Sequence, residues 1–221
     1  METIAKRDYV SAAVIRRLPR YYRFLGTLLS RGVTRISSRE IAQMMGLTAS
    51  QIRQDLNCFG GFGQQGYGYN VEALRSEIGR ILGLDKGFNA ILVGAGNLGR
   101  AIANYVDFSA KGFNLIGIFD KDPAKVGTLL AGHTIQSTDD IAQFCREHMP
   151  DVAALTIPLD ATKAALDTLV GAGVLGFWNF THYDVAYDYP QCSVESVFLE
   201  DSLMTLSYLI NEKHNDEDDE G

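Results

Sequence analysis

Apolar and polar residues follow two different periods along this chain. Between residues 11 and 83 the apolar residues recur every three to four positions, which predicts amphipathic helices. From residue 88 onward, short runs of β-branched and aliphatic residues alternate with helical segments, a pattern typical of strands buried in a parallel sheet. The hydrophobic pattern therefore predicts a helical N-terminal part followed by an α/β part.

The first apolar stripe lies close to Pro19. Tyr21, Leu25, Leu28 and Leu29 share one helical face and are expected in the core. Proline lacks the backbone N–H that a helix interior requires, but the first turn of a helix does not use this group. We therefore expect Pro19 to lie in the first turn of a second helix, which follows a shorter first one.

Two short helices are predicted next, over residues 39–45 and 49–58. A hydroxyl side chain that can accept from free backbone N–H groups precedes each of them, and a glycine separates them. Two helices of this size joined by such a turn form the helix-turn-helix arrangement. The predicted caps are Ser37 or Ser38 for the first helix, Gly46 at its end, and Thr48 for the second.

The second helix of this pair is predicted to be the recognition helix, the one that enters the DNA major groove. Ile52, Leu56 and Phe59 form its buried stripe, so the opposite face carries a hydroxyl, two amides and a guanidinium. Such groups can contact base edges and nearby phosphates. The predicted DNA-binding residues of this helix are Ser50, Gln51, Arg53 and Gln54.

A glycine-rich stretch, residues 59–69, follows this helix. Its glycines between aromatic residues favour a two-stranded hairpin, a wing whose tip at Gln64 and Gln65 can approach a minor groove. The charge distribution favours double-stranded DNA as the partner, because residues 1–80 contain 12 Lys and Arg against 6 Asp and Glu, and the rest contains 8 against 21. An ordinary solvated basic face is the alternative.

The α/β part opens with a strand, a glycine turn and a helix. Residues 90–93 form the predicted strand, and a G-x-G-x-x-G spacing typical of dinucleotide-binding proteins follows directly. The first glycine permits the tight turn, the second lets the backbone approach a pyrophosphate, and the third lets helix and strand pack closely. The predicted phosphate-binding residues are Gly94, Ala95, Gly96, Asn97, Leu98 and Gly99.

Asp120 follows the next predicted strand, residues 115–119. A carboxylate at this position can accept hydrogen bonds from both adenosine ribose hydroxyls and would repel a 2′-phosphate, so NAD(H) rather than NADP(H) is the expected cofactor. The alternative is a glycine turn in another α/β domain, or in one that binds a different nucleotide such as coenzyme A.

The remaining segments complete a doubly wound parallel sheet of the Rossmann type, which an amphipathic helix within residues 71–88 joins to the N-terminal part. Thr156 and Pro158 lie at the end of one predicted strand, where they would line the cofactor crevice. The predicted strands are residues 90–93, 115–119, 134–136, 152–156 and 176–179, and the predicted helices are residues 98–108, 139–148 and 161–172.

A strand that turns into a helix is predicted over residues 195–210. Its apolar surface is larger than a solvated terminal helix would show, so we expect it to be buried on another subunit. The acidic end of the chain is expected to have no regular structure. The predicted domains are a winged-helix DNA-binding domain (1–83), an NAD-binding domain (84–195), a dimerisation helix (196–212) and an acidic tail (213–221).

Enzyme chemistry finds little support in the sequence. The four histidines are scattered, and only His182 and Tyr183 fall near the crevice as candidates for dehydrogenase chemistry. No substrate domain accompanies the nucleotide fold, so we expect no catalytic activity. The three cysteines have no metal-ligand spacing, and no apolar run is long enough for a membrane span or a signal peptide. These features favour a cytoplasmic protein without a metal site.

Together these features resemble the Rex family of redox-sensing transcriptional repressors, over nearly the whole chain. The resemblance implies a homodimer with a swapped C-terminal helix, which binds palindromic operators and releases them when NADH rises relative to NAD. The motifs that carry it are Arg17-Leu18-Pro19-Arg20-Tyr21-Tyr22-Arg23, Ile52-Arg53-Gln54-Asp55, Gly63-Gln64-Gln65-Gly66-Tyr67-Gly68-Tyr69, Gly94-Ala95-Gly96-Asn97-Leu98-Gly99 and Phe119-Asp120.

The resemblance also implies that Arg17 helps to couple cofactor to DNA and that Tyr105 lies near the nicotinamide. Two features depart from the family pattern. Phe198 stands where the family has the aspartate that pairs with the coupling arginine, and Ser202 replaces a nearby glutamate. The family's basic wing tip is Gln64-Gln65 here, which lowers the expected affinity for phosphate.

The sequence thus predicts a dimeric DNA-binding repressor that senses NAD(H). The same architecture with a weak or absent redox response is the first alternative, because Phe198 cannot form the ion pair. A small NAD-dependent oxidoreductase with an appended winged helix is the second, and turnover of NADH with a carbonyl substrate would identify it.

Overall fold

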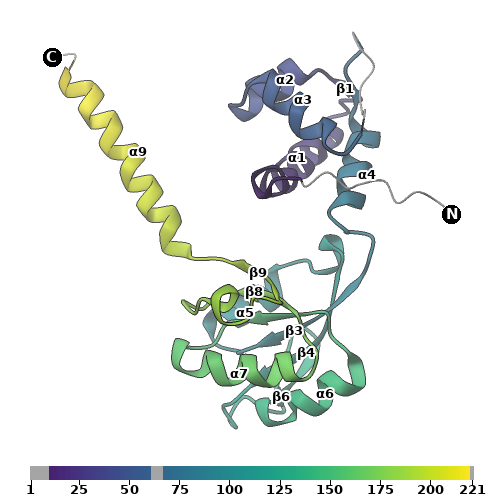
Figure 1. The fold of residues 1–221 in the computed structure, drawn as a ribbon, viewed down its shortest axis with the longest axis vertical. Helices are drawn as coiled ribbons and strands as arrows, with labels where there is room; N and C mark the ends of the chain where they lie inside the picture. Colours follow the sequence, from purple (N-terminus) through teal and green to yellow (C-terminus); the bar gives the residue numbers. More distant parts are fainter. Residues whose placement is uncertain (1–9, 61–66, 220–221) are drawn as a thin grey trace. The chain divides into compact units, whose positions relative to one another are not determined.

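The computed structural model describes residues 10–60 and 67–219, and it divides the chain into two compact units, Met1–Lys86 and Gly87–Gly221 (Figure 1). This division falls three residues later than the predicted one. Residues 84–86 stay with the first unit because the N–H of Leu84 donates to the carbonyl of Gly79, and the N–H of Lys86 donates to that of Gly83.

The N-terminal unit combines a helix-turn-helix, as predicted, with a two-stranded sheet that differs from the hairpin predicted within residues 59–69, because the strand at Tyr69 pairs with a segment before α2. Strands β1 and β2 pair antiparallel, with Ile36 opposite Tyr69. The predicted wing tip, Gln64 and Gln65, lies outside the described residues. The elements are α1 (Ala12–Ser30), β1 (Arg35–Ile36), α2 (Ser38–Met45), α3 (Ala49–Asn57), β2 (Tyr69–Asn70) and α4 (Val71–Ile81).

Helix α1 is continuous through Pro19, so the predicted pair of helices at this place is wrong. The reason is packing, because residues on both sides of the proline, among them Leu18, Tyr21 and Leu25, are buried in one core. A proline inside a helix costs about 3 kcal/mol. Burial of each large apolar side chain contributes about 1.5–3 kcal/mol, so the continuous apolar face outweighs that cost.

The caps of the helix-turn-helix are as predicted. Ser37 caps α2 and forms a capping box with Glu40, whose side chain accepts from the Ser37 N–H. Gly46 ends this helix in the left-handed conformation, with φ of 65°, and the hydroxyl of Thr48 accepts from the N–H of Gln51 at the start of α3. The turn between the two helices is therefore fixed by local chemistry.

The C-terminal unit is built on one seven-stranded sheet in the order β5-β6-β4-β3-β7-β8-β9, parallel except for β5 (Figure 1). The chain first builds outward from β3 to one side and then returns to build on the other, which is the predicted doubly wound topology. The strands are β3 (Phe88–Val93), β4 (Phe113–Asp120), β5 (Leu129–Leu130), β6 (His133–Ser137), β7 (Val152–Leu155), β8 (Gly176–Asn179) and β9 (Ser193–Ser196).

Helices cover both faces of this sheet, and alternate strand residues enter two different cores. Ile91 and Val93 pack in one core with side chains of α6 and α7, whereas Leu92 packs in the other with side chains of α5. This period of two is the one expected for a strand buried on both faces. The helices are α5 (Asn97–Tyr105), α6 (Ile141–His148), α7 (Leu159–Gly171) and α8 (Val185–Asp188).

The last helix, α9 (Leu199–Asp219), leaves its apolar side chains exposed, among them Leu203 and Leu206. It extends beyond residue 213, where the sequence predicts no regular structure. The difference has a simple physical basis, because extending an existing helix fixes one residue per hydrogen bond gained and avoids the cost of nucleation. None of the described helices is long and apolar enough to cross a membrane.

Candidate nucleotide-binding cleft and DNA-binding surface

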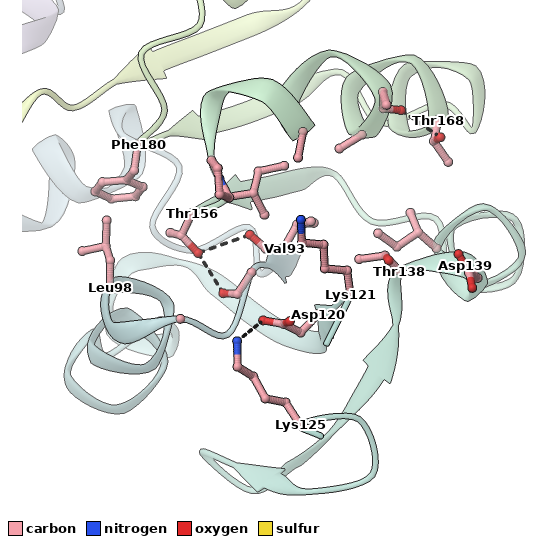
Figure 2. A pocket seen from close by; sticks show the side chains of 18 residues that line it. Val93, Leu98, Asp120, Lys121, Lys125, Thr138, Asp139, Thr156, Thr168 and Phe180 are labelled. Carbon is pink, nitrogen blue, oxygen red and sulfur yellow. Dashed lines mark hydrogen bonds and ion pairs between the residues drawn. The ribbon is translucent and has the colours of Figure 1, made fainter. Parts of the chain in front are cut away.

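A cleft of about 690 Å³ opens at the carboxyl ends of the central strands β3, β4 and β7 (Figure 2). This is the place where doubly wound sheets bind nucleotides, because the strand order reverses there. Of the residues predicted to bind the cofactor, six line the cleft, namely Gly94, Gly96, Leu98, Asp120, Thr156 and Pro158.

Each of the three glycines of the turn occupies its position for a different structural reason. A Cβ at Gly99 would lie 2.0 Å from the carbonyl oxygen of Gly94, so only glycine allows α5 to pack this closely on the turn. Gly94 has φ of +102°, and a Cβ there would lie 2.7 Å from the carbonyl oxygen of Thr156. Gly96 has open space around its missing Cβ, which leaves room for a ligand to approach the backbone.

The N-terminus of α5 is left without a side-chain cap. Gly96 is the N-cap residue and has no side chain to accept from the first N–H groups of the helix. These N–H groups lie at the end of α5 that borders the cleft, where the positive end of the helix dipole also lies. Both features favour binding of an anion such as a pyrophosphate.

Thr156 ties the end of β7 to the glycine turn. Its hydroxyl Oγ1 lies 2.8 Å from the carbonyl oxygen of Gly94 and 3.2 Å from that of Val93 (Figure 2). Thr156 therefore holds the turn in place as well as lining the cleft. Pro158, two residues later, is exposed and directly precedes α7.

Asp120 is buried and already accepts three hydrogen bonds. Its Oδ2 accepts from the N–H of Ala95 at 2.7 Å and from Lys125 Nζ at 3.0 Å, and its Oδ1 accepts from the N–H of Asp122 at 2.8 Å. Burial alone would raise the pKa of Asp120, but these donors outweigh burial and hold the pKa below its ordinary value. The carboxylate is thus ionised and anchors the glycine turn.

Ala95, Asn97 and Gly99 of the turn are not among the residues that line the cleft, and three further residues considered near the crevice lie outside the lining as well. Tyr105, at the end of α5, is 89% exposed. The His182 ring stacks on Phe198 with ring centres 5.6 Å apart, and its Nε2 lies 3.0 Å from Glu200 Oε1. Tyr183 donates its hydroxyl to Asp188. Among the described residues that line the cleft there is no histidine or cysteine.

In the N-terminal unit, the structure reveals a buried carboxylate that sequence reasoning missed. Asp55, in α3, is fully buried and accepts four hydrogen bonds from three side chains. Arg17 donates from Nε at 2.6 Å and from Nη2 at 2.8 Å, the Tyr21 hydroxyl donates at 2.6 Å, and Gln51 Nε2 donates at 2.8 Å. The sequence holds one indication that Asp55 is buried, because Asp55 directly precedes Leu56, a residue of the predicted buried stripe.

This network fixes the protonation of its members. Burial opposes the charge of Asp55, but the hydrogen bonds from Arg17, Tyr21 and Gln51 lower its pKa below the ordinary value. Burial and the contact with Asp55 raise the pKa of Tyr21, so that its hydroxyl remains a donor. The resemblance implies that Arg17 helps to couple cofactor to DNA, and in this structure Arg17 also holds α1 to α3 through Asp55.

The outer face of α3 carries the remaining predicted DNA contacts. Ser50, Arg53 and Gln54 are exposed, whereas Gln51 is half-buried by its bond to Asp55. Arg53 Nη1 lies 3.2 Å from the hydroxyl of Ser38 at the start of α2, which steadies a side chain that is otherwise free in solvent. These side chains are available to base edges and phosphates.

Comparison with known proteins identifies the family. The chain is 52% identical over 204 residues to the redox-sensing transcriptional repressor Rex of Clostridioides difficile (strain 630), covering 92% of this chain and 96% of that one. It is 50% identical over 210 residues to the Rex repressor of Thermoanaerobacter sp. (strain X514), covering 95% and 93%. The chain belongs to the Rex family.

Solved structures of a Rex-family repressor, RSP, have the same fold. RSP in complex with β-NAD⁺ and operator DNA matches with a TM-score of 0.87 at 50% identity, covering 97% of this chain and 98% of that one. RSP in complex with β-NADH matches with a TM-score of 0.88 at 47% identity, covering 96% and 99%. The predicted fold class, an N-terminal DNA-binding domain followed by a Rossmann-type sheet, is confirmed.

Two family models match parts of this Rex chain. One is described as "Putative DNA-binding protein N-terminus" and covers residues 9–57, and the other as "CoA binding domain" and covers residues 85–183. The second description names coenzyme A, which the sequence leaves open as an alternative ligand of the glycine turn. The solved relatives named above are complexes with NAD⁺ and NADH.

Proposed function

We propose that this protein is a DNA-binding transcriptional repressor that binds a palindromic operator as a homodimer and releases it when NADH occupies the cleft. The observation that carries this proposal is the union, in one chain, of a helix-turn-helix with exposed polar side chains on α3 and a nucleotide-type cleft at a glycine turn. The RSP complexes with NAD⁺ and operator DNA and with NADH support it. We place its action in the cytoplasm, where both ligands occur.

The cleft would hold the cofactor through its backbone and its apolar walls. The uncapped N-terminus of α5 would bind the pyrophosphate over Gly96. Figure 2 shows Leu98 and Phe180 facing each other at one end of the cleft. An apolar surface of this kind disfavours the positive charge of an oxidised nicotinamide and so favours NADH over NAD⁺. Tyr105, exposed in the single chain, would approach the nicotinamide only in the assembled dimer.

The DNA contacts are assigned to α3 and to the wing. Ser50, Arg53 and Gln54 would meet base edges and phosphates. Gln64 and Gln65, which the sequence predicts at the tip of a wing, would add contacts to the DNA. Because the ionised Asp55 can only accept, Gln51 must turn its Nε2 inward and its oxygen outward. Gln51 would therefore read a base amino group, which adenine and cytosine present in the major groove.

Helix α9 is the proposed dimer contact. Leu199, Leu203, Leu206 and Ile210 recur every three to four residues and are all exposed in the single chain. Such a stripe is the seam along which helices pack. We propose that a second subunit buries it, with the helix exchanged between the subunits.

A second candidate function is the same repressor with a weak redox response. Phe198 carries no charge and stacks on His182, and Arg17 is already held by Asp55. Phe198 therefore cannot form the ion pair that the resemblance implies would link cofactor binding to the DNA-binding unit.

A titration separates these functions. The full-length protein is added to a fluorescent palindromic operator alone, with NAD⁺ and with NADH. Release by NADH and not by NAD⁺ supports the redox sensor. Binding that ignores both cofactors supports the second candidate, and absence of DNA binding contradicts both. Turnover of NADH with carbonyl substrates would instead indicate an oxidoreductase.

A further inference from the structure

A short loop joins the wall of the cleft to the base of helix α9. Residues 180–183, the β8 loop, follow β8 directly, and the first of them, Phe180, lines the cleft, where it faces Leu98 (Figure 2). Residues 196–198, the α9 root, lie at the end of β9 and directly precede α9. Because β8 and β9 are paired in the sheet, these two segments lie side by side.

The buried amide of Asn179 holds the β8 loop to the α9 root. Its Oδ1 accepts from the N–H and the hydroxyl of Thr181, at 3.0 and 2.7 Å. Its Nδ2 donates to the carbonyl of Tyr183 at 3.0 Å and to the hydroxyl of Ser196 at 3.1 Å. The backbone carbonyl of Asn179 accepts from the N–H of Val197 at 2.8 Å. Asn179 is fully buried and its amide makes all four of its hydrogen bonds, so a shift of one segment alone would leave a buried polar group unpaired.

A second contact joins the same two segments at the surface. The rings of His182 and Phe198 stack with their planes 10° apart, and His182 Nε2 lies 3.0 Å from Glu200 Oε1 in the first turn of α9. Both partners of the polar contact are largely exposed, so it adds little to stability. What it fixes is the direction in which α9 leaves the sheet.

We propose that Asn179 and His182 are positioning residues that transmit occupation of the cleft to helix α9. A cofactor ring that packs against Phe180 would displace the β8 loop, and the amide of Asn179 and the ring of His182 would carry that displacement to the α9 root. Two subunits bind a palindromic operator at once, so a change in the direction of the dimer helix changes the separation of the two recognition helices. The inference rests on the proposed function, because it assumes a dinucleotide in the cleft and a dimer contact on α9.

The test measures the coupling between NADH and DNA in the full-length protein. The coupling factor is the operator Kd at saturating NADH divided by the operator Kd without cofactor, and fluorescence anisotropy gives both values. We expect His182→Ala and Ser196→Ala each to lower this factor about fivefold or more, because each removes one of the two links. Operator affinity without cofactor and NADH affinity without DNA should each stay within about twofold of the wild type.

A matched control and a reciprocal measurement separate coupling from a structural role. His148 on α6 also stacks on a phenylalanine, Phe144, with ring centres 4.2 Å apart, and it does not line the cleft, so His148→Ala should keep the coupling factor. Linkage requires that NADH bind the operator complex of His182→Ala more tightly than that of the wild type, by the same factor that the coupling loses. A residue that only stabilises the fold would not produce this gain.

The outcomes are distinguishable from failure of the proposed function. An unchanged coupling factor in both His182→Ala and Ser196→Ala would overturn this inference and leave the redox sensor intact. A loss of NADH affinity in the free variants that accounts for the lower factor would also overturn it, since the residues would then act on the cleft itself. Dissociation of the His182→Ala dimer would do the same. Operator binding by the wild type that ignores NADH would overturn the proposed redox response and this inference together.

Discussion

A single buried carboxylate, Asp55, organises the DNA-binding unit. Its partner Arg17 is 38 residues away in the sequence, so no local spacing predicts that the two side chains are in contact. An aspartate on a short helix ordinarily predicts a solvent-exposed position, and only the folded arrangement of α1 and α3 shows that this one is enclosed. By contrast Ser37, Gly46 and Thr48 act on neighbouring residues, which is why their roles could be predicted from the sequence.

We expect Asp55→Asn to destabilise the protein by about 2–3 kcal/mol, because it replaces a charged acceptor of Arg17 and Tyr21 by an amide that must also donate. Chemical denaturation at neutral pH measures this loss. Glu72→Gln is a suitable control, since Glu72 is exposed on α4 and should change stability little. Equal stability of both variants would contradict the conclusion that the hydrogen bonds of Asp55 stabilise the DNA-binding unit.

The same residue predicts a pH dependence. The pKa of Asp55 is lower in the folded protein than its ordinary value, so its contribution is complete above that ordinary value and is lost as the pH falls through the folded pKa. The difference in unfolding free energy between the wild type and Asp55→Asn should therefore shrink as the pH falls below about 4. A constant difference down to about pH 2 would contradict this assignment.

At the scale of elements, α3 and the glycine turn before α5 were the most predictable, because each depends on a local motif. The strand β5, with two residues, and the continuous path of α1 through Pro19 were not, since both depend on contacts with distant segments. Thr156 was predicted to line the cleft, but its hydrogen bonds to Val93 and Gly94 could be seen only once β7 and β3 lay side by side.

Arg53→Ala tests α3 as the recognition helix. Loss of one base-reading or phosphate-binding side chain costs about 1–3 kcal/mol, so operator affinity should fall about tenfold to a hundredfold while NADH affinity is unchanged. Arg146→Ala, on α6 of the other unit, removes the same charge and should leave operator binding intact. Unchanged DNA affinity in Arg53→Ala would remove the assignment.

Three glycine variants separate the roles of the turn. Gly99→Ala places a methyl group 2.0 Å from the Gly94 oxygen and should destabilise the protein by about 1–3 kcal/mol and weaken NADH binding. Gly96→Ala meets no atom within 4 Å, so it should keep the melting temperature and weaken NADH alone. Gly171→Ala, also without a contact, is the control for both. Equal melting temperatures for all three would contradict the packing argument.

At the scale of the whole molecule, the apolar stripe of α9 is exposed in the single chain and needs a second surface to bury it. The sequence predicts that this helix meets another subunit, because apolar surface of this extent is rare on a solvated helix. It cannot tell which surface receives the helix, since that depends on the shape of a partner rather than on the local pattern.

The double variant Leu203→Glu, Leu206→Glu should convert a dimer into a monomer, because it places two charges on the seam. Light scattering coupled to size exclusion measures the mass. Affinity for a palindromic operator should fall with it, whereas NADH binding to the cleft should persist. Glu200→Gln is the control on the same helix. A dimer that survives the double variant would move the interface elsewhere.

The glycine turn is held from both sides before any ligand arrives, by Thr156 on one flank and by Asp120 on the other. No segment of the phosphate site has to be ordered when the cofactor enters, so little conformational entropy is lost there on binding. Binding then needs no slow ordering step, so occupancy of the cleft would follow the reduced cofactor pool at a pace set only by encounter with the cofactor and by its dissociation.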